Sequence, residues 1–146
     1  MDCGITGALK SFYGILSMSD GRYRQRHYTR LGQHCGEMMA KVRSPVINIL
    51  DCIWVSQDAL AGYPPENTTK LDQLLASVDP VALDYWATKY LLYPIDKSEE
   101  HHPDRFALLR NHLIEARDTI NLAGGINGHR VTLDETEINV QSSRCQ

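Results

Sequence analysis

The stretch L-D-Q-L-L-A-S-V-D-P-V-A-L-D, at residues 71–84, decides the fold predicted for this chain. Its first half, residues 71–77, is a short apolar run that fits a strand, although a helix of this length would leave a similar pattern. Asp79 followed by Pro80 is a helix-start signal, because the carboxylate can accept amide protons of the first turn and proline fits the first helical position. We therefore predict a strand that leads directly into a helix running to about Leu92.

Apolar residues surround most of the circumference of this helix, so we expect it to lie between two layers and to end at Pro94. Upstream, the run V-I-N-I-L-D-C-I-W-V at residues 46–55 is nearly continuous, apolar and β-branched. Such a run is typical of a central strand buried on both faces. The segment between the two strands, residues 56–69, has the turn-forming composition of a long connection that is often functional.

Weaker patterns on both sides of this unit predict four further elements. They are a short helix within residues 5–16, an amphipathic helix at residues 22–41 weakened by Gly32 and Gly36, a helix opened by Pro103 and ended by Gly124 and Gly125, and a strand or hairpin at residues 129–140.

This order of strands and helices favours an α/β fold over a helical bundle. We expect a layered sheet, mixed or mostly parallel, with helices packed on it and a C-terminal strand or hairpin. The 146 residues suit one domain, residues 1–146, with a single core.

Composition excludes several functional classes. A formal net charge of −3 gives no reason to expect nucleic acid as a partner. The arginines of residues 22–30 form either a small basic patch or a solvated helix face. No apolar run approaches the ~20 residues of a membrane span and no secretory signal is present, so we expect a cytoplasmic protein without membrane contact. The cysteines form no C-x-x-C pair, which leaves free thiols and argues against zinc-ribbon or ferredoxin motifs.

Three blocks of sequence carry a resemblance to a known family. They are A-L-K-S-F-Y-G at residues 8–14, the strand segment ending in Asp51, and A-S-V-D-P-V-A-L-D at residues 76–84, with Arg26 and His27 as a further matching pair. These blocks resemble the family called domain of unknown function 362, and the chain is similar to its C-terminal portion, an incomplete version of the domain. Many members resemble iron–sulfur proteins, because they carry ferredoxin-type cysteine motifs in an additional region. The resemblance therefore implies a redox-linked function.

The candidate site is expected where the strand at Ser77 and the start of the following helix meet, because helix amides and dipole favour an anion there. We expect a small anionic metabolite, with Asp51 and Asp84 as catalytic candidates. The ligand-binding candidates are Lys10, Arg26, His27, Ser77 and Asp79.

Several of these residues have a second interpretation. Asp79 is also the natural helix cap, and it does not share a helix face with Asp84, since five residues rotate the two side chains by roughly 140°. Asp51 either faces a site, with Lys10 or Arg26 as a nearby cation, or caps a turn where the strand stops at Leu50. Lys10 is either an anion contact or a surface residue.

No metal site is expected from the histidines. His27 and His34 would lie roughly 10 Å apart along one helix, too far to share an ion. His101 and His102 follow each other in a connection, where we expect them to be exposed to solvent.

Three hypotheses about function follow. The first is a domain that binds the small anionic metabolite, with the reaction, if any, and the cofactor unknown. The second is a non-catalytic module that self-associates through an open sheet edge, a homo-oligomer. The third is an accessory iron–sulfur-associated protein.

Overall fold

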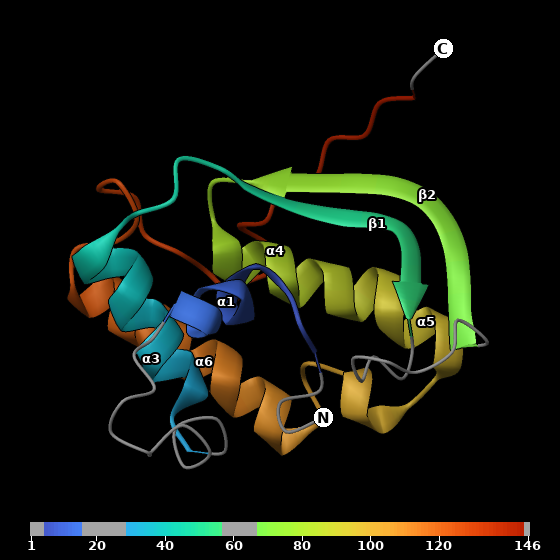
Figure 1. Ribbon diagram of the computed structural model, residues 1–146, viewed down its shortest axis with the longest axis horizontal. Coiled ribbons are helices and arrows are strands. Elements are labelled where there is room, and N and C mark those ends of the chain that lie inside the picture. The colour runs from blue at the N-terminus through green and yellow to red at the C-terminus, as the bar shows by residue number, and fades with distance from the viewer. Residues whose placement is uncertain (1–4, 16–28, 57–66, 145–146) are drawn as a thin grey trace.

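The computed structural model describes residues 5–15, 29–56 and 67–144. Figure 1 shows a curved β-hairpin lying over one side of helix α4, with α3 and α6 on the other side. In chain order the elements are α1 (Ala8–Ser11), a 3-10 helix (Phe12–Ile15), α3 (Leu31–Glu37), a π-helical turn (Met38–Val42), β1 (Asn48–Ser56), β2 (Thr68–Ser77), α4 (Pro80–Ala87), a π-helical turn (Thr88–Leu92), α5 (Tyr93–Asp96), a 3-10 helix (Glu99–His101) and α6 (Ala107–Leu122).

The chain is a mixed α/β protein, but its sheet differs from the predicted one. Strands β1 and β2 form a two-stranded antiparallel sheet, with Asn48 opposite Ser77 and Ser56 opposite Thr68. The prediction of a mixed or mostly parallel layered sheet is wrong. Parallel neighbours need a crossover of a dozen or more residues, usually a helix, whereas only residues 57–67 separate these two strands.

The predicted C-terminal strand or hairpin is also wrong. Residues 129–140 contain one turn and otherwise no regular secondary structure, and the region contributes only an isolated bridge between Ile126 and His129 to β structure. Side chains hold this segment instead: Lys89 Nζ lies 2.7 Å from Glu135 Oε2 and 2.8 Å from Asp104 Oδ2. The alternation of apolar and polar residues at 129–140 therefore belongs to a segment that packs against the rest of the protein without pairing as a strand.

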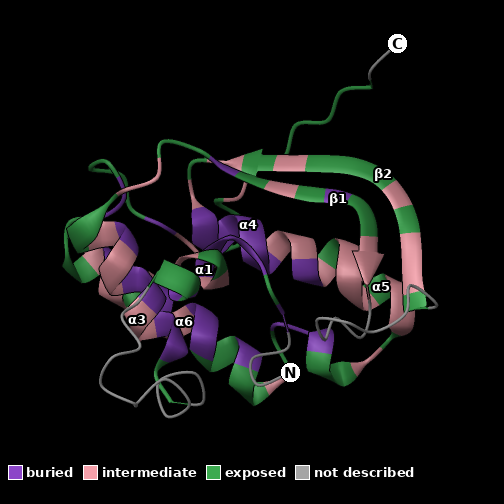
Figure 2. Cartoon of the chain, viewed as in Figure 1, coloured by how far each residue is buried: buried purple, intermediate pink, exposed green. Residues whose placement is uncertain are grey.

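Strand β1 is buried on one face only, which corrects the prediction of a central strand. Asn48 and Cys52 are buried towards α4, while Ile49 on the opposite face is 63% exposed. Leu74, which lies opposite Asp51 on the same outer face, is 68% exposed. Figure 2 shows exposed and intermediate residues along most of the hairpin. None of the described elements covers this outer face.

Helix α4 begins as the sequence predicts. Asp79 caps it, and Pro80 to Tyr85 are all buried. Pro94, however, does not end the helical run. It lies at the second position of α5, directly after the π-helical turn, and the run continues to Asp96 before Lys97 turns away in a left-handed conformation (φ 56°).

Helices α3 and α6 approach each other closely, and Gly32 makes this possible. A Cβ atom at Gly32 would lie 2.0 Å from the backbone oxygen of His112 in α6. Gly32, which was expected to weaken the predicted helix, thus allows α3 to pack closely against α6. Of the predicted helix at residues 22–41, residues 22–28 lie outside the described part, and α6 begins at Ala107 rather than at Pro103.

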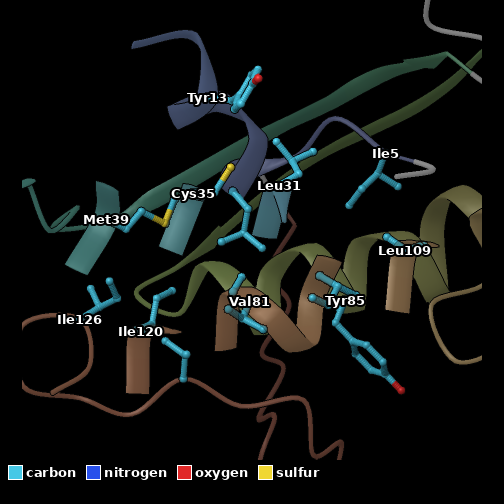
Figure 3. Packing of buried hydrophobic residues seen from close by; sticks show 14 residues of the cluster. Ile5, Tyr13, Leu31, Cys35, Met39, Val81, Tyr85, Leu109, Ile120 and Ile126 are labelled. Atoms are coloured by element: carbon cyan, nitrogen blue, oxygen red, sulfur yellow. The ribbon is translucent and has the colours of Figure 1, made fainter. Parts of the chain in front are cut away.

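The hydrophobic core lies where α1, α3, α4 and α6 meet (Figure 3). Its fully buried side chains include Leu9 of α1, Met39 of the π-helical turn after α3, Val81 of α4 and Ile120 of α6. Cys35 belongs to this core. Neither Cys35 nor Cys52 forms a disulfide, as predicted, whereas Cys3 and Cys145 lie outside the described residues. None of the described helices is both long and apolar enough to cross a membrane.

Candidate functional site

A cavity of about 310 Å³ lies between the C-terminal half of β1 and the α4 helix with its π-helical continuation. The segment before α1 and the connection after α5 complete the described part of its wall. Its lining residues are Ile5, Thr6, Gly7, Leu50, Asp51, Cys52, Trp54, Val55, Ser56, Asp84, Ala87, Thr88, Leu91, Leu92 and His101. Both catalytic candidates from the sequence, Asp51 and Asp84, contribute to this one cavity.

Asp84 is the most buried ionisable group in this lining, 1% exposed. Its Oδ1 accepts the Ala8 amide at 2.7 Å and its Oδ2 accepts the Leu9 amide at 3.0 Å, so one carboxylate caps the start of α1. A Cβ at Gly7 would lie 2.3 Å from Oδ1, and only glycine leaves room for this approach. Burial raises the pKa of Asp84 to about 7, although the two amide bonds act in the opposite direction.

Asp51 occupies the middle of β1 rather than its end. The strand continues to Ser56, so the alternative in which it stops at Leu50 is wrong. Asp51 Oδ1 accepts the amide of Ile53 at 2.9 Å, next to the irregularity in strand pairing between Cys52 and Trp54. Asp51 is exposed and contributes to the rim of the cavity. Burial, and then the charge of Asp51, raise the pKa of the Cys52 thiol, which keeps it protonated.

His101 is buried, which corrects the prediction that His101 and His102 are exposed. Its Nδ1 lies 2.7 Å from Asp96 Oδ2, and Asp96 Oδ1 accepts the amide of Ser98 at 2.9 Å. Sequence reasoning missed this pair. The tight turn at Lys97 brings Asp96 and His101 together, and a spacing of five residues across a connection signals no such contact by itself.

Ser77 and Asp79 form the predicted corner between strand and helix, but they do not line the cavity. Asp79 Oδ1 accepts the amides of Val81 and Ala82 at 2.8 and 2.9 Å, which confirms the helix cap. Its Oδ2 accepts the amide of Thr132 at 2.8 Å, and Ser77 Oγ accepts the Asp79 amide at 3.0 Å. Asp79 itself therefore occupies the amides that an anion would use at the start of α4.

The cationic candidates do not join Asp51 and Asp84 in the described structure. Lys10 is half-buried on α1 and lies outside the cavity lining. Arg26 and His27 lie outside the described residues. Within residues 5–15, 29–56 and 67–144, no three His, Cys, Asp or Glu side chains gather as metal ligands would.

Comparison with protein families shows which family the chain belongs to. A family model described as Domain of unknown function (DUF362) matches residues 1–89. The chain belongs to this family. The DUF362 match includes Asp51, Asp79 and Asp84 but ends before Asp96 and His101. The blocks at residues 8–14 and 76–84, which carry part of the DUF362 resemblance, meet in space. Asp84 of the later block accepts the amides of Ala8 and Leu9 in the earlier one.

The cavity therefore combines two parts of the chain. Most of the described lining lies within the DUF362 match, and Leu91, Leu92 and His101 follow it in sequence. Neither the comparison with curated proteins nor that with solved structures finds a match.

Proposed function

We propose that this DUF362 protein binds a small neutral or cationic organic molecule in the cavity between β1 and α4. The observation that carries the proposal is the composition of the described lining. It has apolar walls that include Trp54, Leu91 and Leu92, together with the polar groups Asp84 and His101, and no lysine or arginine. A volume of about 310 Å³ matches the lower end of small-molecule sites, which are mostly apolar with few polar groups.

The predicted anionic metabolite is less well supported by this lining, because its described residues include the carboxyl groups of Asp51 and Asp84 and no lysine or arginine that could pair with an anion. The hollow beside Asp79 is no better for an anion. Its described lining includes Arg117 and Arg130 but also three other carboxylates, Asp118, Asp134 and Glu137. The anionic ligand stays a prediction, as does a redox-linked role, which depends on the family resemblance alone.

Three ligands with one ring and different head groups test the proposal: benzylamine, benzyl alcohol and benzoate. We expect the amine and the alcohol to bind more tightly than benzoate in titrations followed by NMR. Replacing Ala87 in the cavity wall with phenylalanine should fill the space and weaken binding by at least about tenfold, equivalent to roughly 1.4 kcal/mol.

Ala123→Phe is the matched control, because Ala123 is exposed at the end of α6 and outside the cavity lining. Binding should be unchanged in this variant. Preferential binding of benzoate, or equal loss of binding in both variants, would contradict the proposal.

A second candidate function is self-association, and the outer face of the hairpin favours it. Ile47, Ile49, Leu74 and Val78 are all more than half exposed there. A two-fold axis would place this face against the same face of a second copy, so that apolar side chains cover each other as in a sheet sandwich. We propose a second copy of the chain as the occupant, because the exposed side chains on this part of the face are apolar on both strands, apart from Asp51 opposite Leu74.

Sedimentation equilibrium tests self-association. The wild type should show a dimer mass that falls to the monomer mass in the double variant Ile49→Lys and Leu74→Lys, because two lysines per copy would have to be buried in an apolar interface. Ile15→Lys, at an equally exposed isoleucine away from the hairpin, should stay dimeric. A monomeric wild type at all concentrations would rule this candidate out.

A further inference from the structure

His101 is held rigidly at the wall of the cavity. Its side chain is 8% exposed, and the side chain of its partner Asp96 is 16% exposed. The Ser98 amide fixes one oxygen of Asp96, and the other oxygen faces His101 Nδ1 at 2.7 Å. The imidazole therefore lies between an anchored carboxylate and the cavity that it helps to line.

The contact with Asp96 determines which imidazole nitrogen carries the proton. An ionised carboxylate only accepts hydrogen bonds, so Nδ1 must donate, and in the neutral ring Nε2 then carries the lone pair. Among the described residues, Nε2 of His101 has no hydrogen-bond partner. A bound molecule would therefore meet a hydrogen-bond and proton acceptor at this position.

The neighbouring His102 provides a natural contrast. It is about as buried as His101, but its Nδ1 accepts the amide of Asp104 at 3.3 Å, so its neutral ring carries the proton on Nε2. Its ring packs edge-on against Tyr93 at 4.7 Å, and it is absent from the described cavity lining. These contacts assign opposite tautomers to the two adjacent histidines, and only His101 belongs to the described lining of the cavity.

We infer that His101 is the proton acceptor of this cavity, that Asp96 positions it, and that the bound molecule offers it a hydroxyl or amine proton. The inference rests on the proposed ligand-binding function and narrows its ligand class to hydrogen-bond donors. In a full transfer, the proton would leave the ligand O–H or N–H group and bind Nε2, and the Asp96 carboxylate would stabilise the resulting imidazolium. This is the general-base arrangement in which a third group orients the histidine.

The tautomers are tested without any ligand, by NMR of protein labelled with ¹⁵N in its histidines, at a pH above the ordinary imidazole range. We expect an unprotonated Nε2 in His101 and an unprotonated Nδ1 in His102. Asp96→Asn should reduce this preference in His101, because the amide of asparagine can donate to Nδ1, and should leave His102 unchanged. A proton on Nε2 of His101 in the wild type would overturn the inference.

Ligand binding gives the second test, with benzyl alcohol compared with benzyl methyl ether, which lacks the donor. The wild type should prefer the alcohol by about tenfold, the effect of one hydrogen bond worth roughly 1.4 kcal/mol. His101→Phe should abolish the preference, and His102→Phe should keep it. Equal binding of both compounds to the wild type would overturn the inference. If neither these compounds nor benzylamine binds, the proposed function fails, and the tautomers still decide the role of His101.

Discussion

Replacing Gly32 with alanine is expected to lower the free energy of unfolding by roughly 2–3 kcal/mol, near the upper end of overpacking effects. The new methyl group would lie 2.0 Å from the His112 backbone oxygen and 3.0 Å from the Ala116 amide nitrogen. Because both atoms belong to the backbone of α6, no side-chain rotation relieves the clash, and the two helices must separate. Urea unfolding followed by circular dichroism measures the change.

Gly14→Ala is the matched control. A Cβ at Gly14 meets no atom within 4 Å. Alanine restricts the unfolded chain more than glycine does, so this variant should be as stable as the wild type or slightly more stable. Equal effects at Gly32 and Gly14 would mean that α3 and α6 do not cross as closely as described.

Replacing Asp84 with alanine is expected to have an equal or larger effect, a loss of roughly 2–6 kcal/mol in the free energy of unfolding. The substitution leaves the buried amides of Ala8 and Leu9 without their acceptor, at about 1–3 kcal/mol for each unsatisfied donor. Asp118→Ala, which removes an exposed carboxylate paired with its neighbour Arg117, should change stability by less than about 0.5 kcal/mol. Thermal unfolding of the three proteins measures the difference, and a small effect at Asp84 would contradict its role as the cap of α1.

The pH dependence of stability provides an independent readout of Asp84. Burial raises its pKa in the folded protein to about 7, from an ordinary value of 3.8 in the unfolded chain. Between these values the folded state holds a proton that the unfolded state has lost, so the contribution of Asp84 to stability falls as the pH rises through this window. This fall of stability with rising pH should be absent in Asp84→Asn. If the variant shows the same fall, other groups cause it.

Local signals in the sequence predicted the local structure well. Asp79 and Pro80 start α4, residues 46–55 contain most of β1, and the short run before Ser77 is a strand. Each of these depends on residues a few positions apart, whose backbone preferences and caps act within one turn or strand. The same reasoning could not predict the direction of strand pairing, because an apolar run pairs equally well either way until its connections are known.

The sequence likewise predicted only part of the candidate site. The sequence placed Asp51 and Asp84 in one site, and both line the cavity, but it placed Lys10, Ser77 and Asp79 there too, and these lie elsewhere. It missed His101 because a histidine in a polar connection gives no sign of burial. The packing of that connection against α4 and α5 determines its exposure.

By itself, the amino-acid order determined where helices and strands begin, that the protein mixes both, and which family it belongs to. Only the tertiary structure decided that Asp84 caps a helix 76 positions earlier in the chain, that Gly32 provides a helix crossing, and that His101 faces a cavity. Caps and turns depend on neighbours in sequence, whereas burial and the partners of a charged group depend on chain segments that meet only when the whole core has formed.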